Sequence, residues 1–552
     1  MRCRGNALLL ALSWNLLALP AWAEPPADPP AEESEPDLST ITDTVTSTAT
    51  ATETPLNATP ASVTVLSRED LEESAAVTLD DALRQVPGFT LFRRSGSRTA
   101  NPTAQGASLR GIGGSAASRA LVLADGVPVN DPFGGWVYWG RVPKAAIERV
   151  EVLRGGASDL YGSSALAGVV QLVRRSPGAG DLFAEVSGGE QGTAQGSLWA
   201  GTRRAGWELS AAAEVLDTEG YVPVAPGFRG EVDAEAGSRH RAAEVMGAHR
   251  PSEGGWTSPA LSLAGSWFDE DRDNGTVLQV NDTISRRAWL GADWWLEAGS
   301  LTVKAWGGDQ GVHQTFTAVA DDRDSERLVR EQQVPAEELG GSARFTSPVA
   351  GGRHTLLAGI EVRRLEGVSE ERIFLPGRVV PSDSGGRQRL EGIYVEDVAR
   401  LHPKLSLAAG LRFDRWQNRD RFPEPGVPGE RDEEAVSPRL SLLWQVRPAL
   451  GVTAAAYRSF RAPTLNELYR GFRVGDVVTA PNAALEAERL RGAEAGVLWQ
   501  PAGSGAAWLR ATVFRMELEE AIANVTLSVG PEVIQRQRRN LGETRSQGFE
   551  VE

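Results

Sequence analysis

Apolar and polar residues alternate with a period of two through most of the chain after about residue 181. In segment 405–414, leucine, alanine and phenylalanine alternate with small or polar residues, and the pattern recurs in segments 436–444, 207–215, 261–267 and 301–306. This period places successive side chains on opposite faces of a β-strand. One apolar and one polar face fit a membrane β-barrel or a soluble β-sandwich, so the pattern alone leaves both open. Long charged gaps, such as 320–338 and 418–434, are typical of the long loops on one side of a barrel.

The first 180 residues follow a different pattern. Segment 147–175 predicts a strand, a glycine-rich turn, a stretch of small residues and a second strand. Segment 119–130 predicts two short strands joined at an Asp-Gly turn. Two pairs of a hydroxyl residue and an aspartate three positions later predict helix starts at Ser67 and Thr78. These elements indicate a small α+β domain that precedes the alternating region.

The N-terminus has the pattern of an export signal. A basic start and an apolar run precede an A-x-A sequence, which predicts a signal peptide over 1–23 with cleavage after Ala23. Cys3 is the only cysteine and would leave with the signal. Residues 24–59 are rich in proline, acid and threonine, and we expect them to form a disordered linker. No later apolar run reaches the length of about eighteen residues that a membrane helix needs, which leaves a soluble protein or a barrel.

Four motifs occur in the order and at the spacing of a known protein family. They are LRG at 109–111, DGVPV at 125–129, IERVEVLRG at 147–155 and LYGSSALAGVV at 160–170. Together they resemble the plug domain of TonB-dependent outer-membrane receptors. The sequence FRAPTLNELY at 460–469, with segments 482–488 and 540–552, resembles the barrel of the same family.

The resemblance implies a β fold class, namely a transmembrane antiparallel β-barrel filled by an N-terminal α+β plug domain. We expect the plug over 60–178 and the barrel over 181–552. The family closes its barrel with about 22 strands, whereas about twenty residues per strand and loop would give about seventeen here. Because a membrane sheet cannot leave an edge in lipid, we expect an incomplete barrel, with roughly 100–150 residues following Glu552.

The resemblance also implies a function. Such receptors lie in the outer membrane of Gram-negative bacteria, among its lipids, and take up scarce nutrients, energised by the proton-motive force through TonB with ExbB and ExbD. The expected substrate is a small molecule, most often a ferric siderophore or similar metal chelate; cobalamin, haem and glycans are alternatives. An exported β protein that binds at the surface without transport is the alternative from another class. The strip that resembles the TonB box would add a strand to TonB, and it consists of Asp43, Thr44, Val45, Thr46, Ser47 and Thr48.

Charge and motifs argue against other classes. The net charge of −16 and the pI near 5.1 disfavour binding to nucleic acid. The sequence contains no P-loop, no zinc-protease motif and no serine-hydrolase motif, and its five histidines lack the spacing of metal ligands. We therefore expect no enzyme activity, no cofactor and no resident metal.

Two groups of candidate site residues come from the plug-like region and its partners. Three arginines suit an anionic ligand, and four aromatic residues suit a flat ligand or, equally, a wedge between plug and barrel. These ligand candidates are Arg93, Arg94, Arg98, Phe133, Trp136, Tyr138 and Trp139. In the resembling receptors, two plug arginines pair with glutamates of the inner barrel wall, because a buried charge needs a partner. The matching positions are Arg110, Arg154, Glu488 and Glu550.

Overall fold

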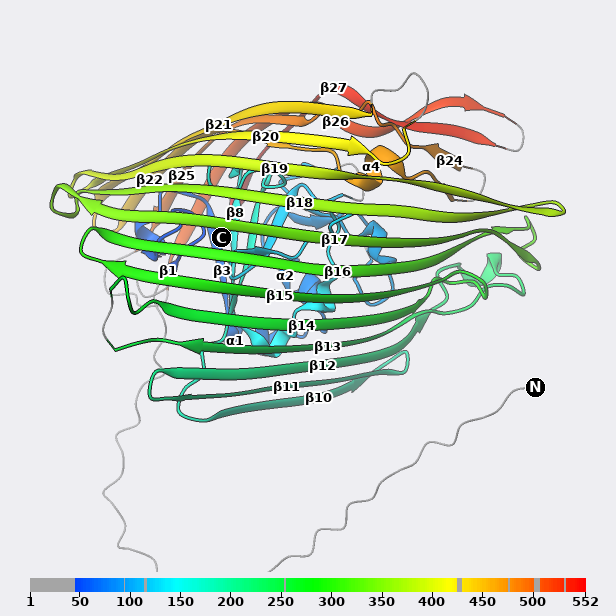
Figure 1. Ribbon diagram of the computed structural model, residues 1–552, viewed down its shortest axis with the longest axis horizontal. Coiled ribbons are helices and arrows are strands. Elements are labelled where there is room, and N and C mark those ends of the chain that lie inside the picture. The colour runs from blue at the N-terminus through cyan, green and yellow to red at the C-terminus, as the bar shows by residue number, and fades with distance from the viewer. Residues whose placement is uncertain are drawn as a thin grey trace, which may run out of the picture.

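The computed structural model describes residues 45–552 except 94, 114–116, 253–254, 424–428, 475–476, 501–506 and 531–532. A large curved β-sheet surrounds a smaller inner domain, which is drawn in blue and cyan (Figure 1). The predicted signal peptide and residues 24–44 of the expected linker lie outside the described residues. Within the described part of the chain, no helix has the length and apolar character needed to cross a membrane.

The inner domain is built on a five-stranded sheet with the order β3-β8-β9-β6-β7. Strands β6 and β9 run parallel, and the other neighbours run antiparallel. Close passage of two backbones requires a glycine at Gly168, where a Cβ would lie 2.2 Å from the carbonyl oxygen of Leu153. The strands predicted within 119–130 and 147–175 are therefore present. The five strands are β3 (Val63–Ser67), β6 (Ala120–Ala124), β7 (Val127–Pro128), β8 (Ile147–Arg154) and β9 (Gly168–Arg174).

Both predicted helix starts are present in this domain. The Ser67 hydroxyl accepts a hydrogen bond from the Asp70 backbone N–H at 3.1 Å, and the Asp70 carboxylate accepts one from the Ser67 N–H at 2.7 Å. This reciprocal pair caps the first helix and satisfies two donors that the helix leaves open. Thr78 stands directly before the second helix. The short elements are α1 (Arg68–Glu73), α2 (Leu79–Leu83), α3 (Ser158–Tyr161), β4 (Phe89–Leu91), β5 (Ala107–Leu109), and the 3₁₀ turns η1 (Leu56–Ala58), η2 (Pro102–Ala104), η3 (Trp139–Arg141) and η4 (Lys144–Ala146).

The first described residues pack against the inner domain. Strand β1 (Val45–Thr46) pairs antiparallel with β2 (Thr54–Pro55). Ala49 and Leu56 are buried in a cluster with apolar residues of the plug sheet. Residues 45–59, which we expected to belong to a disordered linker, are thus ordered here because their small and apolar side chains are covered by the plug.

Among the described residues, the outer sheet contains 18 strands, β10 to β27, and each strand from β11 to β22 pairs antiparallel with the one before it. After β22 the chain forms α4 (Leu465–Tyr469), β23 and β24, and β25 then pairs with β22. Among the described residues, the edge strands β10 and β27 do not pair with each other. The strands are β10 (Asp181–Gly189), β11 (Thr193–Arg204), β12 (Trp207–Tyr221), β13 (Ala236–His249), β14 (Ala260–Asp273), β15 (Val280–Leu296), β16 (Gly299–Val319), β17 (Glu326–Val349), β18 (His354–Leu375), β19 (Arg378–His402), β20 (Leu405–Asp420), β21 (Glu430–Arg447), β22 (Leu450–Arg461), β23 (Phe472–Val474), β24 (Val477–Ala480), β25 (Glu488–Trp499), β26 (Leu509–Val529) and β27 (Ile534–Val551).

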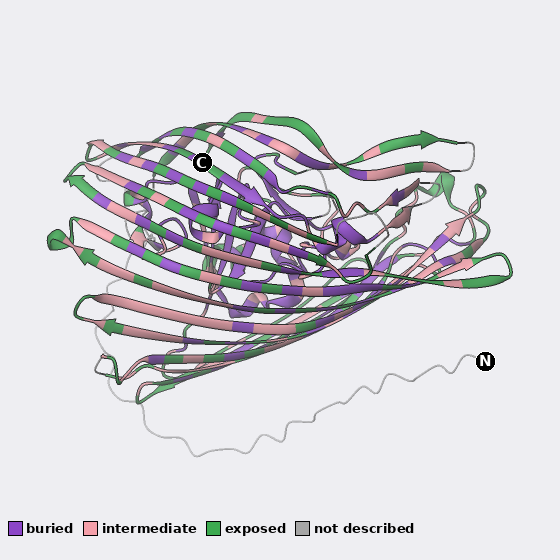
Figure 2. Ribbon diagram, turned by 45° about the horizontal axis from the view of Figure 1, so that its top comes forward, coloured by how far each residue is buried: buried purple, intermediate pink, exposed green. Residues whose placement is uncertain are grey.

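Exposure alternates along these strands as the sequence pattern predicts (Figure 2). In β12, Leu209 and Val215 are 56% and 52% exposed, whereas Ser210 and Glu214 are 9% and 5% exposed. The apolar side chains therefore face outward, and the polar side chains face the plug. This pattern is the reverse of that in a soluble protein, and it suits a wall whose outer face meets lipid.

The two ends of the outer sheet differ in the length of their connections. On one end most links have two to four residues, such as 205–206, 297–298, 403–404 and 448–449, and two, 250–259 and 500–508, are longer. On the other end the links include 222–235 and the excursion 462–487, which contains α4. Strand β1 and helix α4 are labelled toward these opposite ends in Figure 1.

Candidate functional site

Arg110 and Arg154 of the plug contact carboxylates of the last described strand. Arg110 donates to Glu550 through Nε at 3.1 Å and Nη2 at 2.8 Å, and it also contacts Glu494 on β25. Arg154 lies 3.6 Å from Glu550 and 2.7 Å from Glu552. The structure therefore brings Arg110, Arg154 and Glu550 together, as the resemblance implied, and adds two further carboxylates.

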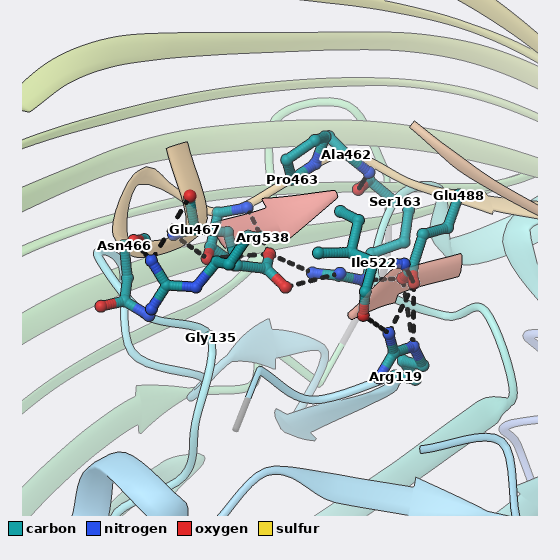
Figure 3. A network of polar contacts seen from close by, with 12 residues as sticks. Arg119, Gly135, Ser163, Ala462, Pro463, Asn466, Glu467, Glu488, Ile522 and Arg538 are labelled. Carbon is teal, nitrogen blue, oxygen red and sulfur yellow. Dashed lines mark hydrogen bonds and ion pairs between the residues drawn. The ribbon is translucent and has the colours of Figure 1, made fainter. Parts of the chain in front are cut away.

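Glu488 has different partners from those that the resemblance suggested. Arg119 donates to Glu488 through Nη2 at 2.5 Å, and Arg461 donates to the other carboxylate oxygen through Nε at 2.5 Å. The backbone N–H of Ile522 adds a bond of 2.8 Å. Sequence patterns do not identify Arg119 as a partner of Glu488. A charged residue directly before the wholly apolar strand β6 is a signal that could have indicated a buried ion pair. The network links the plug to β22, β25 and β26 (Figure 3).

This network continues into the α4 connection. Arg461 also donates to Glu467 at 2.9 Å and 3.0 Å. Burial alone would raise the pKa of Glu467, but the charge of Arg461 and its hydrogen bonds lower that pKa to about 2. Glu467 forms a capping box with Thr464, so the same carboxylate starts helix α4. The plug and the α4 connection are thus held by one chain of buried charges.

The four predicted aromatic ligand residues are buried in packed clusters. Phe133, Trp136, Tyr138 and Trp139 are 1%, 2%, 4% and 3% exposed. Phe133, Trp136 and Tyr138 belong to a cluster with residues of the outer sheet and α4, and Trp139 belongs to the main plug core. Their placement agrees with the wedge that we considered as the alternative. A loop sequence alone does not tell whether its aromatic residues face a ligand or the barrel wall.

A cavity of about 350 Å³ lies between the plug and the end of the sheet that has the long connections. Its plug wall comes from residues within 92–93 and 95–104, and its outer wall includes the ends of several strands and the region after α4. Arg93 lines this cavity, and Arg98 does not. Arg94 lies outside the described residues.

The described residues that line the cavity include arginines and aromatic rings but no Asp or Glu. The arginines are Arg93, Arg470, Arg473 and Arg538, and the aromatic residues are Phe92, Tyr221, Phe316 and Phe472. In a chain of net charge −16, a cavity wall of this composition is unusual. The arrangement is suited to an anionic ligand that also presents rings.

Two of these arginines are buried and held in place by the protein. Arg538 donates to the carbonyl oxygens of Asn466 at 3.0 Å and Arg470 at 2.6 Å. Arg470 donates to the Asn466 side chain at 3.2 Å, and its buried Nε atom finds no partner among the described residues. Burial lowers the pKa of Arg470 to about 10, helped by the nearby charge of Arg538 and opposed by that of Glu371. The protein therefore places buried positive charge beside this cavity.

The strip that resembles the TonB box lies near the short-link end of the sheet. Asp43 and Thr44 lie outside the described residues. Val45 and Thr46 form β1, and Ser47 and Thr48 follow it. We expected an uncommitted extended peptide, but Thr46 and Thr48 are buried against the plug. The structure thus shows residues 46–48 in a docked state.

Comparison with known proteins agrees with this architecture. The family model for the TonB-dependent receptor plug domain matches residues 55–169, and the model for the TonB-dependent receptor-like β-barrel matches residues 232–552. The vitamin B12 transporter BtuB of Vibrio vulnificus is 37% identical over 172 residues, which cover 31% of this chain and 27% of that protein. An iron-regulated outer membrane virulence protein of Vibrio cholerae is 25% identical over 437 residues, which cover 74% of this chain and 58% of that protein. The chain therefore spans less than two thirds of the length of either relative.

Solved structures share the fold at low sequence identity. The siderophore receptor PirA from Acinetobacter baumannii superposes with a TM-score of 0.67 and 17% identity, covering 89% of this chain and 77% of PirA. The ferric yersiniabactin uptake receptor FyuA from Yersinia pestis gives a TM-score of 0.68 and 16% identity, covering 90% of this chain and 76% of FyuA. The barrel model alone matches more than half of the chain, and the plug model matches a separate segment before it. This chain belongs to the TonB-dependent receptor family.

Proposed function

We propose that this protein is an outer-membrane receptor of a Gram-negative bacterium that takes up an anionic metal chelate, most specifically a ferric siderophore with aromatic groups. The observation that carries this proposal is the arginine-rich cavity, whose described lining residues include no Asp or Glu. Uptake would be energised by the proton-motive force through TonB, with ExbB and ExbD. The signal peptide would be removed after Ala23.

The positions of the cavity and the strip support a direction of transport. Outer-membrane barrels have short periplasmic turns and longer extracellular loops. The cavity lies at the end with the long connections, and residues 46–48 lie toward the short links. A ligand would thus bind on the outer side of the plug, while the strip would face the periplasm.

Cobalamin is the second candidate substrate, because one relative is a vitamin B12 transporter. Cobalamin lacks the concentrated negative charge of a ferric catecholate complex. The arginine-rich cavity therefore favours the catecholate, whereas the sequence similarity alone does not separate the two. Haem, a flat ring system with two carboxylates, would also fit an arginine-lined cavity with aromatic residues, but it carries less negative charge than a ferric catecholate complex. Glycans have no specific observation in their favour.

Binding to the purified receptor in detergent would test the substrate. Titration calorimetry would compare a trianionic ferric catecholate, an uncharged ferric hydroxamate and cobalamin. We expect the catecholate to bind at least tenfold more tightly than the other two. Tight binding of cobalamin, or equal binding of both ferric complexes, would contradict the proposal.

A substitution in the cavity would identify the site. Arg470→Gln should weaken catecholate binding at least tenfold, which corresponds to about 1.4 kcal/mol, because it removes a buried positive charge next to the ligand. Arg239→Gln is the matched control, since the Arg239 side chain is 55% exposed and lies away from the cavity. Both variants should melt at the temperature of the wild type, and equal affinities for the catecholate would remove Arg470 from the site.

A substitution in the strip would test energy coupling. Val45→Pro removes a backbone donor and fixes φ, so the strip could no longer add a strand to TonB. Uptake of the radiolabelled ferric complex by cells should stop, whereas binding to the purified receptor should be unchanged. Normal uptake by Val45→Pro would show that coupling does not use strand pairing at this position.

A further inference from the structure

One carboxylate oxygen of the plug collects four hydrogen bonds from the docked strip. Glu151 Oε2 accepts from the Thr46 hydroxyl at 2.7 Å and the Thr48 hydroxyl at 2.6 Å. It also accepts from the backbone N–H groups of Ser47 and Thr48, each at 2.9 Å. The other oxygen, Oε1, accepts from Arg149 at 2.9 Å. Glu151 is therefore the centre of the contact between strip and plug.

The other contacts of the strip are few. The β1–β2 ladder has two residue pairs, Val45 with Pro55 and Thr46 with Thr54. A two-stranded ribbon of this length is not stable by itself in water. The Tyr161 hydroxyl adds one bond to the Thr48 carbonyl oxygen at 2.8 Å. Because hydrogen bonds to a charged acceptor are stronger than neutral ones, the carboxylate is the strongest polar contact of residues 46–48, beside the apolar burial of Ala49 and Leu56.

The surroundings of Glu151 keep it ionised and leave room beside it. Burial would raise its pKa, but the bonds from Thr48 and Thr46 and the charge of Arg149 lower it below the usual range. A cavity of about 550 Å³ lined by Ser47, Thr48 and Arg149 lies next to the strip. The strip therefore has space into which it can leave without displacing the plug.

We propose that Glu151 is a latch that holds residues 46–48 on the plug and keeps the strip from pairing with its partner in the resting receptor. The proposal rests on the proposed function, in which this strip is the TonB contact. Strand addition to a partner edge uses the backbone N–H of every second residue, so it needs that of Ser47 or that of Thr48. Glu151 occupies both, so docking and pairing exclude each other. The latch must open before the partner can bind.

The position of Glu151 on β8 connects the latch to the plug–barrel ion pairs. β8 ends at Arg154, three residues further along, whose side chain contacts Glu550 and Glu552. The Glu151 backbone also pairs with Val65 on β3 and with Gln171 on β9. A displacement of β8 that disturbs the ion pairs would thus move the carboxylate relative to the strip.

A thiol placed in the strip would measure release directly. Cys3 is the only cysteine of residues 1–552 and precedes the predicted cleavage site, so Ser47→Cys supplies the sole thiol of residues 24–552. Ser47 contacts Glu151 through its backbone N–H. Among the described contacts, its side chain makes no hydrogen bond to Glu151. The rate of reaction with a charged maleimide would be measured on purified receptor in detergent, without ligand and without TonB.

We expect Glu151→Gln to accelerate labelling at least tenfold over Ser47→Cys alone. Glu148→Gln is the matched control, because Glu148 lies on the same strand, is 44% exposed in its side chain and pairs with Arg68 rather than with the strip. The control should label at the original rate. An unchanged rate in a folded Glu151→Gln receptor would overturn the latch.

A second variant keeps the test valid if Glu151→Gln does not fold. Thr46→Val with Thr48→Val removes the two hydroxyl bonds and leaves Glu151 and the strip backbone in place. This variant should also accelerate labelling, and no acceleration would overturn the latch.

A separate binding measurement distinguishes the latch from the proposed function. The affinity of the periplasmic domain of TonB for the ligand-free receptor should rise in Glu151→Gln. If labelling accelerates but TonB affinity does not change, the latch stands and the strip is not the TonB contact. If TonB affinity rises without faster labelling, the strip is a TonB contact and Glu151 is not its latch.

Discussion

Glu488→Ala should loosen the plug from the barrel more than any exposed ion-pair substitution. Glu488 receives Arg119 from the plug, Arg461 from β22 and the Ile522 backbone N–H. The side chains of both arginines and of Glu488 are 2% exposed or less. Removal of this carboxylate leaves two buried positive charges. Arg461 keeps its bonds to Glu467, and Arg119 keeps its bond to the Ile522 carbonyl oxygen.

The size of the effect follows from burial. Removing one partner of a buried ion pair costs about 3–5 kcal/mol, because the remaining charge stays desolvated. Arg461 keeps its bonds to Glu467, so most of the loss falls on Arg119, which directly precedes β6. Asp432→Ala is the comparison, because Asp432 and Arg415 are 40% and 45% exposed. An exposed pair contributes at most about 1 kcal/mol.

Hydrogen exchange would measure this difference within the plug. Where exchange reflects local opening, protection factors give the opening free energy. A loss of about 3–5 kcal/mol would lower the protection of amides in 120–124 by roughly two to nearly four orders of magnitude. If Glu488→Ala and Asp432→Ala leave these amides equally protected, the desolvation of the buried charges offsets their attraction, and apolar packing alone holds the plug.

Three further substitutions test the packing and the charges. Trp136→Ala should lower the free energy of plug unfolding by about 3–5 kcal/mol in calorimetry. It should leave chelate affinity unchanged, since Trp136 is 2% exposed. Weaker binding with normal stability would show that Trp136 contacts the ligand. Gly156→Ala places a Cβ 2.7 Å from the Tyr457 ring and should cost about 1–3 kcal/mol, whereas Gly227→Ala, with nothing within 4 Å, should melt like the wild type. Because the pKa of Glu467 is lowered to about 2, its ion pair stabilises the fold above the unfolded pKa of about 4.3 and is lost as the pH falls toward about 2. The Tm difference between wild type and Glu467→Gln should therefore stay constant from about pH 8 to 5 and shrink at lower pH; a difference that shrinks already near neutral pH would contradict this assignment.

Local patterns predicted local structure well. Alternation in 405–414 reports which face of a strand is apolar, and the Ser67 cap depends on residues three positions apart, so neither needs distant partners. The pairing of Arg119 with Glu488 depends on how β6 lies relative to β25. A local sequence pattern carries no information about this arrangement. The docking of residues 46–48 could not be predicted from the sequence either, because nothing in the pattern of β8 distinguishes Glu151 from other polar strand residues.

The separations in sequence between the plug arginines and their carboxylates constrain how the receptor is assembled. Arg110, Arg119 and Arg154 contact glutamates that follow them by 440, 369 and 398 residues. These ion pairs can therefore form only once β25 and β27 stand in the sheet, and until then the charges of the plug stay solvated. Docking of the plug is a late step of biogenesis, and a substitution in these pairs will lower the yield of assembled receptor as well as its stability.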